Sequence, residues 1–193
     1  MKQTISTAIM LCCILSAGFI IKPESTGSKT ALKDHEPPCR FEGVYILEPA
    51  GGAATYGLDM AIPLDASNDH VALNHDLANY DVTFGGLFPS AVRLTTGQGE
   101  AIRTGPRTFD YTIHFWALNA NNQRVILIVS NGTKVLNETD CRSYVTTGGM
   151  LSVFTPDQDA DKDGYPDKGQ SPKFCVPVTF KAKRVSVIPP CKP

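Results

Sequence analysis

The chain has 193 residues, of which 42% are hydrophobic and 19% charged, so it can bury the core of one domain. Its formal net charge of −1 at pH 7 is too small to favour nucleic acid or an anionic membrane surface as a partner. The composition therefore indicates a single globular domain and argues against a basic nucleic-acid-binding protein.

The N-terminus is typical of a secretory signal peptide. Lys2 precedes an apolar run from Ala8 to Ile21, with small residues at 16–18, and this layout predicts cleavage after Ala17 or Gly18. The run is shorter than the roughly 20 residues that a membrane helix needs, so no stable membrane span is expected. The alternative is an uncleaved anchor. We expect a secreted protein, or one in the periplasm or at the cell surface.

The polar residues that follow predict a flexible stalk. Residues 22–38 lack hydrophobic periodicity. The expected organisation is a signal peptide at 1–18, a stalk at 19–38 and a domain at 39–193.

Four cysteines remain after signal cleavage, and in an exported chain they predict two disulfides. They form no CxxC pair, so a zinc site is not expected. Three connectivities are open. If the first and last strands run parallel where the sheet closes, Cys39 reaches Cys175, which favours Cys39–Cys175 together with Cys141–Cys191.

From Cys39 onward the sequence pattern indicates β-structure, and no window of ten or more residues has helical periodicity. A Gly85-Gly86 pair suggests a bulge, and Asn131-Gly132 predicts a tight hairpin turn. The glycines at 97, 99 and 105 are interpreted as turn residues that precede a strand. Strands are expected over 41–49, 54–64, 70–77, 80–88, 108–119, 124–130, 133–136, 144–154 and 173–188.

The clearest alternation lies in "TFDYTIHFWALN", residues 108–119. Five apolar residues fall on one face of this strand: Phe109, Tyr111, Ile113, Phe115 and Ala117. Short strands joined by tight turns predict an all-β fold, an antiparallel meander that closes into a small β-barrel. A β-sandwich is the alternative.

The segment "TGQGEAIRTGPRTFDYTIHFW", residues 96–116, followed by two expected hairpins, resembles a group of uncharacterised secreted bacterial β-barrel proteins. These in turn are similar to lipocalin-like and allene-oxide-cyclase-like barrels. The resemblance covers roughly residues 97–130. It implies a cup able to hold a small molecule, and it transfers no catalytic residue.

The stretch "PDQDADKDGYPDKG", residues 156–169, lies in an acidic insertion expected at 156–170. Its D-x-D-x-D-G spacing resembles the calcium loops of EF-hands, dockerins and thrombospondin type 3 repeats. In such a loop alternate side chains converge on one ion, and the glycine allows a sharp turn. The expected Ca²⁺ ligands are the side chains of Asp159, Asp161 and Asp163, the Tyr165 carbonyl, and Asp167 directly or through water.

Gln170 stands where an EF-hand has a bidentate glutamate. The expected site is therefore a structural, extracellular one, with a dissociation constant of about 10⁻⁴ to 10⁻³ M. The alternative interpretation is a solvated acidic turn without metal.

No catalytic motif is evident. The sequence has no GxSxG, HExxH or phosphate-binding loop, and Asp110 and His114 would lie about 13 Å apart along one strand, too far for an acid–base pair. Trp116 beside them either lines a ligand cup or caps the barrel. Asn131 and Asn137 begin glycosylation sequons, which matter only if the source glycosylates.

Three functions follow from these features. The first is a secreted, calcium-stabilised β-barrel that binds a small apolar ligand. The second is a barrel enzyme of the cyclase or isomerase type, for which polar groups facing one another in the lumen would be evidence. The third is a surface or adhesion module, which a filled lumen would favour.

Overall fold

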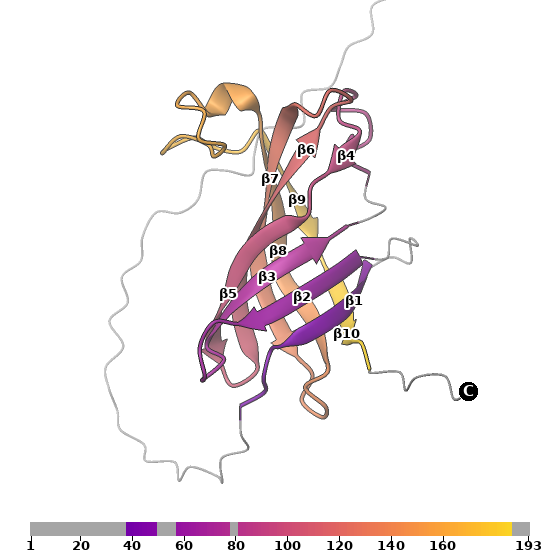
Figure 1. The fold of residues 1–193 in the computed structure, drawn as a ribbon, viewed down its shortest axis with the longest axis vertical. Helices are drawn as coiled ribbons and strands as arrows, with labels where there is room; N and C mark the ends of the chain where they lie inside the picture. The colour runs from indigo at the N-terminus through magenta and orange to yellow at the C-terminus, as the bar shows by residue number, and fades with distance from the viewer. Residues whose placement is uncertain (1–37, 50–56, 78–80, 187–193) are drawn as a thin grey trace, which may run out of the picture. The chain divides into compact units, whose positions relative to one another are not determined.

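The computed structural model describes residues 38–49, 57–77 and 81–186 (Figure 1). The predicted signal peptide, nearly all of the predicted stalk, and Cys191 lie outside these residues. Within them, no helix is long and apolar enough to cross a membrane.

The fold is a closed antiparallel β-barrel, as the sequence pattern predicts (Figure 1). The ring runs β1-β2-β3-β5-β6-β7-β8-β10 and closes where β10 pairs with β1. Two further strands extend it: β4 pairs with β6, and β9 pairs with β8. The strands are β1 (Gly43–Pro49), β2 (Gly57–Pro63), β3 (His70–Asp76), β4 (Arg93–Leu94), β5 (Gly97–Gly105), β6 (Thr108–Leu118), β7 (Arg124–Leu136), β8 (Ser143–Phe154), β9 (Phe174–Val178) and β10 (Phe180–Arg184).

The barrel interior is filled by large side chains from β6 that pack against small residues on β5. The alternation predicted for β6 is confirmed, because its five inward residues are at most 4% exposed. On β5, a Cβ at Gly97 would lie 2.3 Å from the Phe115 ring, and one at Gly99 would lie 1.9 Å from the Thr112 carbonyl oxygen. The prediction that Gly97, Gly99 and Gly105 are turn residues is therefore wrong. They belong to a strand, where the first two let neighbouring groups approach closely.

The predicted strand over residues 80–88 is also wrong where the structure describes it, because residues 82–87 form turns. Asp81 Oδ1 accepts hydrogen bonds from the Thr83 N–H at 3.0 Å and hydroxyl at 2.6 Å, and Oδ2 accepts one from the Gly85 N–H at 2.8 Å. These local bonds compete with strand pairing. Gly85 and Gly86 both have positive φ, which favours the turn further.

The hairpin turn predicted at Asn131-Gly132 does not form. Strand β7 runs through this dipeptide and pairs with β6 on one side and β8 on the other. The register shifts between Asn131 and Thr133, where Gly132 has a φ of +152°. Because β7 is paired on both sides, the dipeptide stays within the strand and forms a local irregularity instead of a turn.

The disulfide pairing predicted from sequence is wrong. Cys39 is bonded to Cys141, with a Cα–Cα distance of 5.4 Å, instead of Cys175. The reason is topological, because β1 and β10 pair antiparallel, whereas the prediction assumed parallel closure. Cys175 is exposed and forms no disulfide with another described cysteine.

Candidate functional site

The acidic loop connects β8 to β9 (Figure 1). A buried glutamine fixes the base of the loop. The loop begins with a 3-10 turn, η1 (Pro156–Gln158). Gln158 accepts a hydrogen bond from the Thr155 N–H at 3.1 Å and donates one to the Ser171 carbonyl at 2.7 Å. Its own carbonyl accepts one from the Asp167 N–H at 2.8 Å. These bonds hold the two ends of the loop together.

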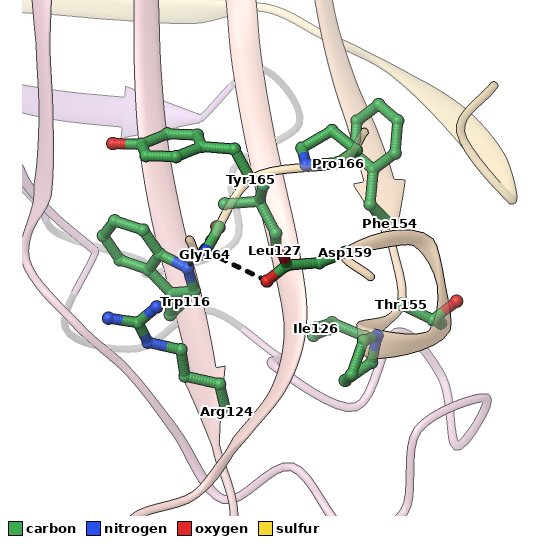
Figure 2. A pocket seen from close by; sticks show the side chains of 11 residues that line it. Trp116, Arg124, Ile126, Leu127, Phe154, Thr155, Asp159, Gly164, Tyr165 and Pro166 are labelled. Carbon is green, nitrogen blue, oxygen red and sulfur yellow. Dashed lines mark hydrogen bonds between the residues drawn. The ribbon is translucent and has the colours of Figure 1, made fainter. Parts of the chain in front are cut away.

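Three of the expected calcium ligands come together in this loop. One carboxylate oxygen from each of Asp159, Asp161 and Asp167, here called the carboxylate cluster, lies within 4.8 Å of the others. Asp159 Oδ2 accepts a hydrogen bond from the Gly164 N–H at 2.9 Å (Figure 2). Asp159 Oδ1 is buried and has no hydrogen-bond partner among the described residues. Three carboxylates this close repel one another, and an all-oxygen donor set suits a hard cation such as Ca²⁺.

Asp163, a fourth expected ligand, lies apart from the other three. It is exposed and does not belong to the carboxylate cluster; its Oδ1 accepts a hydrogen bond from the Tyr165 N–H at 2.8 Å. The ring of Tyr165, whose backbone carbonyl is the fifth expected ligand, packs against His114 and Trp116 of β6. Gly164 has a φ of +97°, in line with the sharp turn expected there, and its carbonyl accepts a hydrogen bond from Trp116 Nε1 at 3.1 Å. The loop is thereby attached to the strand beneath it.

A pocket lies between this loop and strands β6, β7 and β8, and we call it the loop pocket (Figure 2). Its empty volume is about 320 Å³, including the solvent at its mouth. Most of its lining is apolar or aromatic, which is usual for small-molecule sites. It is lined by Trp116, Arg124, Ile126, Leu127, Phe154, Thr155, Pro156, Asp159, Gly164, Tyr165 and Pro166.

Aromatic rings and one cation dominate the mouth of the loop pocket. Tyr165, 44% exposed, lies edge-on to Trp116 and to His114, with centroid distances of 5.9 and 5.2 Å. The guanidinium of Arg124 stacks on Trp116 at 4.7 Å, and no described carboxylate forms an ion pair with it (Figure 2). Partial burial lowers the pKa of His114 despite a backbone hydrogen bond that raises it. Arg124 is thus the positive group available to a ligand.

A second polar group lies inside the barrel, and we call Asp59, His75, Lys134 and Tyr144 the interior network. Lys134 Nζ donates hydrogen bonds to Asp59 Oδ2 and, at 3.0 Å, to the Tyr144 hydroxyl, which donates to the same carboxylate oxygen. His75 Nδ1 lies 3.7 Å from Asp59 Oδ1. Neither of these two atoms has a hydrogen-bond partner among the described residues. All four residues are at most 4% exposed.

Burial and pairing set the protonation states of this network. Burial alone would raise the pKa of Asp59, but Lys134 and His75 outweigh it and hold that pKa well below its usual range. Burial lowers the pKa of His75 and of Lys134, in each case against the opposing effect of Asp59. Burial, reinforced by Asp59, raises the pKa of Tyr144. The network therefore contains a carboxylate, a neutral histidine and a protonated tyrosine.

The interior network is enclosed by aromatic side chains. Phe41, Tyr45, Phe109 and Tyr144 pack in mutual ring contacts with centroids 5.2 to 5.6 Å apart. Lys134 Nζ lies 4.5 to 5.4 Å from the centroids of three rings, those of Phe41, Tyr111 and Tyr144. The lumen is therefore filled around the network, and its charges are enclosed by aromatic rings.

Sequence reasoning missed the interior network. Asp59 and Lys134 are 75 residues apart, and only strand register brings them together. One signal was available for Lys134, because it lies in phase with the inward residues Leu136, Ser130 and Ile128 of its strand. A charged residue at an inward-facing strand position predicts a buried residue of opposite charge, although it does not identify that residue.

Comparisons with known proteins do not identify a family for this chain. No protein-family model matches the chain, and no curated protein matches it. One solved structure, described as "Structure of EF1p2_mFAP2b bound to DFHBI", shares 15% sequence identity over 75% of this chain and 93% of that chain, with a TM-score of 0.42. The β-barrel assignment follows instead from this chain's own strand pairing.

Proposed function

We propose that this chain is an exported, calcium-stabilised β-barrel protein that binds a small, mainly apolar ligand with an anionic group in the loop pocket. One observation carries the proposal: the same loop supplies both the carboxylate cluster and one wall of the pocket. Asp159 belongs to both, and Gly164, Tyr165 and Pro166 follow in the wall.

The calcium part of the proposal rests on the carboxylate cluster. Its oxygens are close enough to share one ion, and Asp159 Oδ1 is a buried acceptor without a described donor. A cation there would offset the repulsion among three carboxylates. Because only the folded loop brings these groups together, bound Ca²⁺ would stabilise the folded state.

The ligand part rests on the pocket lining. Trp116 and Tyr165 offer aromatic surface, and Leu127 and Phe154 offer apolar surface. Arg124 adds a positive charge that no described carboxylate neutralises. The filled lumen is what a surface or adhesion module would have, and it rules out the lumen cup implied by the sequence resemblance. The proposed ligand site is therefore the loop pocket outside the lumen.

Trp116 makes this proposal testable, because it is the only tryptophan in the chain. We would titrate the protein with 8-anilinonaphthalene-1-sulfonate, an aromatic anion, and with neutral N-phenyl-1-naphthylamine, and measure energy transfer from Trp116. Both probes should bind more tightly with calcium than with chelator, since calcium and ligand would stabilise the same loop conformation. Equal affinity in both conditions, or no transfer from Trp116, would contradict the coupling.

Matched variants separate the two parts of the pocket. Arg124→Gln should weaken binding of the anionic probe and leave the neutral probe little changed, whereas Tyr165→Ser should weaken both. Arg107→Gln serves as the control, because this arginine pairs with Glu138 beside the β7–β8 turn and does not line the pocket. If Arg107→Gln and Arg124→Gln act alike, the anion preference does not arise in the loop pocket.

A further inference from the structure

Within the interior network, a lysine amine and a carboxylate are in contact inside the barrel. Lys134 Nζ donates a hydrogen bond to Asp59 Oδ2, and the two residues are 1% and 0% exposed. Neither residue belongs to the loop pocket or to the carboxylate cluster. An amine and a carboxyl group can condense to an amide with release of water, so this contact joins two groups that are able to form a covalent bond.

The two residues lie on opposite sides of the ring of strands. Asp59 is on β2 and Lys134 is on β7. Three strands lie between them in one direction, namely β3, β5 and β6, and three in the other, namely β1, β10 and β8. Strand pairing therefore does not join β2 to β7. An amide between the two side chains would connect opposite walls of the barrel through its lumen.

We propose that Lys134 and Asp59 form an intramolecular amide bond after the barrel has folded. The proton that Lys134 Nζ shares with Asp59 Oδ2 moves to that oxygen, which leaves a neutral amine beside a neutral acid. The nitrogen lone pair then attacks Cγ of Asp59. The bond from Cγ to Oδ2 breaks, and Oδ2 leaves as water with its own proton and a second proton from the nitrogen. Oδ1 becomes the amide carbonyl oxygen, and no oxidant, reductant or cofactor is consumed.

Tyr144 is placed to relay the second proton. Its hydroxyl accepts a hydrogen bond from Lys134 Nζ at 3.0 Å and donates one to Asp59 Oδ2. It can therefore take a proton from the nitrogen while it gives its own to the leaving oxygen, so no tyrosinate forms. On the other side of the carboxyl group, His75 Nδ1 lies 3.7 Å from Asp59 Oδ1, and neither atom has a described hydrogen-bond partner. An N–H at Nδ1 would stabilise the negative charge that Oδ1 gains when the nitrogen attacks.

The surroundings of the pair affect the rate of this reaction in two ways. Three aromatic rings lie against Nζ, and burial lowers the pKa of Lys134, which favours the neutral amine. Burial alone would raise the pKa of Asp59, but Lys134 and His75 hold it low, so the carboxylate resists protonation. A freshly folded chain therefore contains the ion pair, and the amide accumulates slowly. Once formed, the amide is protected from hydrolysis because the rings exclude water.

Intact-mass spectrometry of the purified protein tests this proposal. The wild-type chain is refolded and incubated, and samples are denatured and reduced at intervals before measurement. The mass should fall by that of one water molecule, and a tryptic digest should then contain a branched peptide that links Asp59 to Lys134. Wild-type protein kept unfolded in urea should retain its full mass, because the two groups are then not held together.

Three comparisons assign the reaction to this pair of residues. Lys134→Arg keeps the positive charge without the amine, and it should lose no water. Tyr144→Phe keeps the ring and both reacting groups, and it should slow the loss of water roughly 100-fold. The exposed pair of Lys173 and Asp157, with Nζ 3.1 Å from Oδ2, is a control within the same chain. Their peptides should stay separate, because water stabilises the charged forms of both groups.

A wild-type mass that stays constant while circular dichroism shows a folded barrel would overturn the proposal. A loss of water that persists in Lys134→Arg would do the same. So would a loss that maps to Asp163-Gly164, because an aspartate before glycine can lose water by closing on the next backbone nitrogen. A folded Tyr144→Phe variant that reacts at the wild-type rate would exclude the proton relay.

Discussion

The interior network and the carboxylate cluster are two groups of charged side chains that differ in whether the fold supplies a counter-charge. Inside the barrel, Asp59 and Lys134 come from distant strands, have opposite signs and neutralise each other. In the loop, Asp159, Asp161 and Asp167 come from one short segment and have the same sign. The fold itself supplies the counter-charge of the first group. No described side chain forms an ion pair with the second group. The predictions below test this difference, starting inside the barrel.

The largest effect should come from removing the cation inside the barrel. Lys134→Met leaves Asp59 buried without its partner and should lower the free energy of unfolding by about 3–5 kcal/mol. Adding Asp59→Leu removes the unpaired charge, so the double variant should recover most of that loss. Urea denaturation of the three proteins measures both changes. A double variant no more stable than Lys134→Met would contradict the proposed balance.

The disulfide that joins the chain before β1 to the turn after β7 should have the next largest effect. Cys39 and Cys141 are separated by 102 residues, so their bond restricts a long stretch of the unfolded chain. Replacing both by serine should cost about 2–4 kcal/mol in the free energy of unfolding. Peptide mapping without reduction should recover the Cys39–Cys141 peptide pair. Recovery of Cys39 linked to Cys175 instead would restore the connectivity predicted from sequence.

Calcium should have a smaller effect, confined to the loop. With Kd near 10⁻⁴ M and millimolar calcium, the expected stabilisation is about 1.4 kcal/mol. Asp161→Asn should remove most of it, since Asp161 belongs to the carboxylate cluster. Asp163→Asn is the matched control, because the amide oxygen can still accept the Tyr165 N–H hydrogen bond. Thermal unfolding with calcium and with chelator tests this, and equal losses in both variants would favour the EF-hand-like ligand set.

The smallest expected effect is a pH dependence from the interior. Because burial lowers the pKa of His75, the unfolded chain binds a proton that the folded chain does not as pH falls below the unfolded value of about 6.5. Stability should therefore decrease as pH falls from about 7 to about 5. Asp59, Lys134 and Asp76 are the charged groups that act on the pKa of this histidine. Asp59 would lose its stabilising charge only in strong acid.

His75→Asn should flatten this slope in urea denaturation at several pH values. His114 contributes in the same direction, because its pKa is also lowered, so His114→Asn provides the comparison. An unchanged slope in the His75 variant would show that the interior network does not take part in the acid response.

The sequence predicted those features that depend on one segment at a time. The alternation in β6 identified its buried face correctly, and the aspartate spacing located the loop that forms the carboxylate cluster. Predictions failed where pairing with strands from elsewhere in the sequence determines the local structure. Asn131-Gly132 is a strong turn signal, but pairing with both β6 and β8 keeps it within a strand.

Strand β2 shows why the hydrophobic pattern alone could not predict which of its residues face the interior network. Its bulkier apolar residues, Leu58, Met60 and Ile62, point outward, whereas Asp59 and Ala61 point into the barrel. Asp59 is stable there because Lys134, on a strand far along the chain, supplies its counter-charge. The register that joins them is a property of the whole closed sheet, and a single strand does not contain it.

The ring of strands closes between β1 and β10, two strands that are far apart in the sequence and are not joined by a hairpin. Strand β1 pairs on one side with β2, but its other edge stays open until β10 arrives, with Tyr45 opposite Arg184. The same late strand covers part of β8, with Lys181 opposite Val145. A growing chain that has not yet reached Phe180 therefore has two strand edges with unpaired N–H and carbonyl groups, and those edges are where incomplete molecules would join one another.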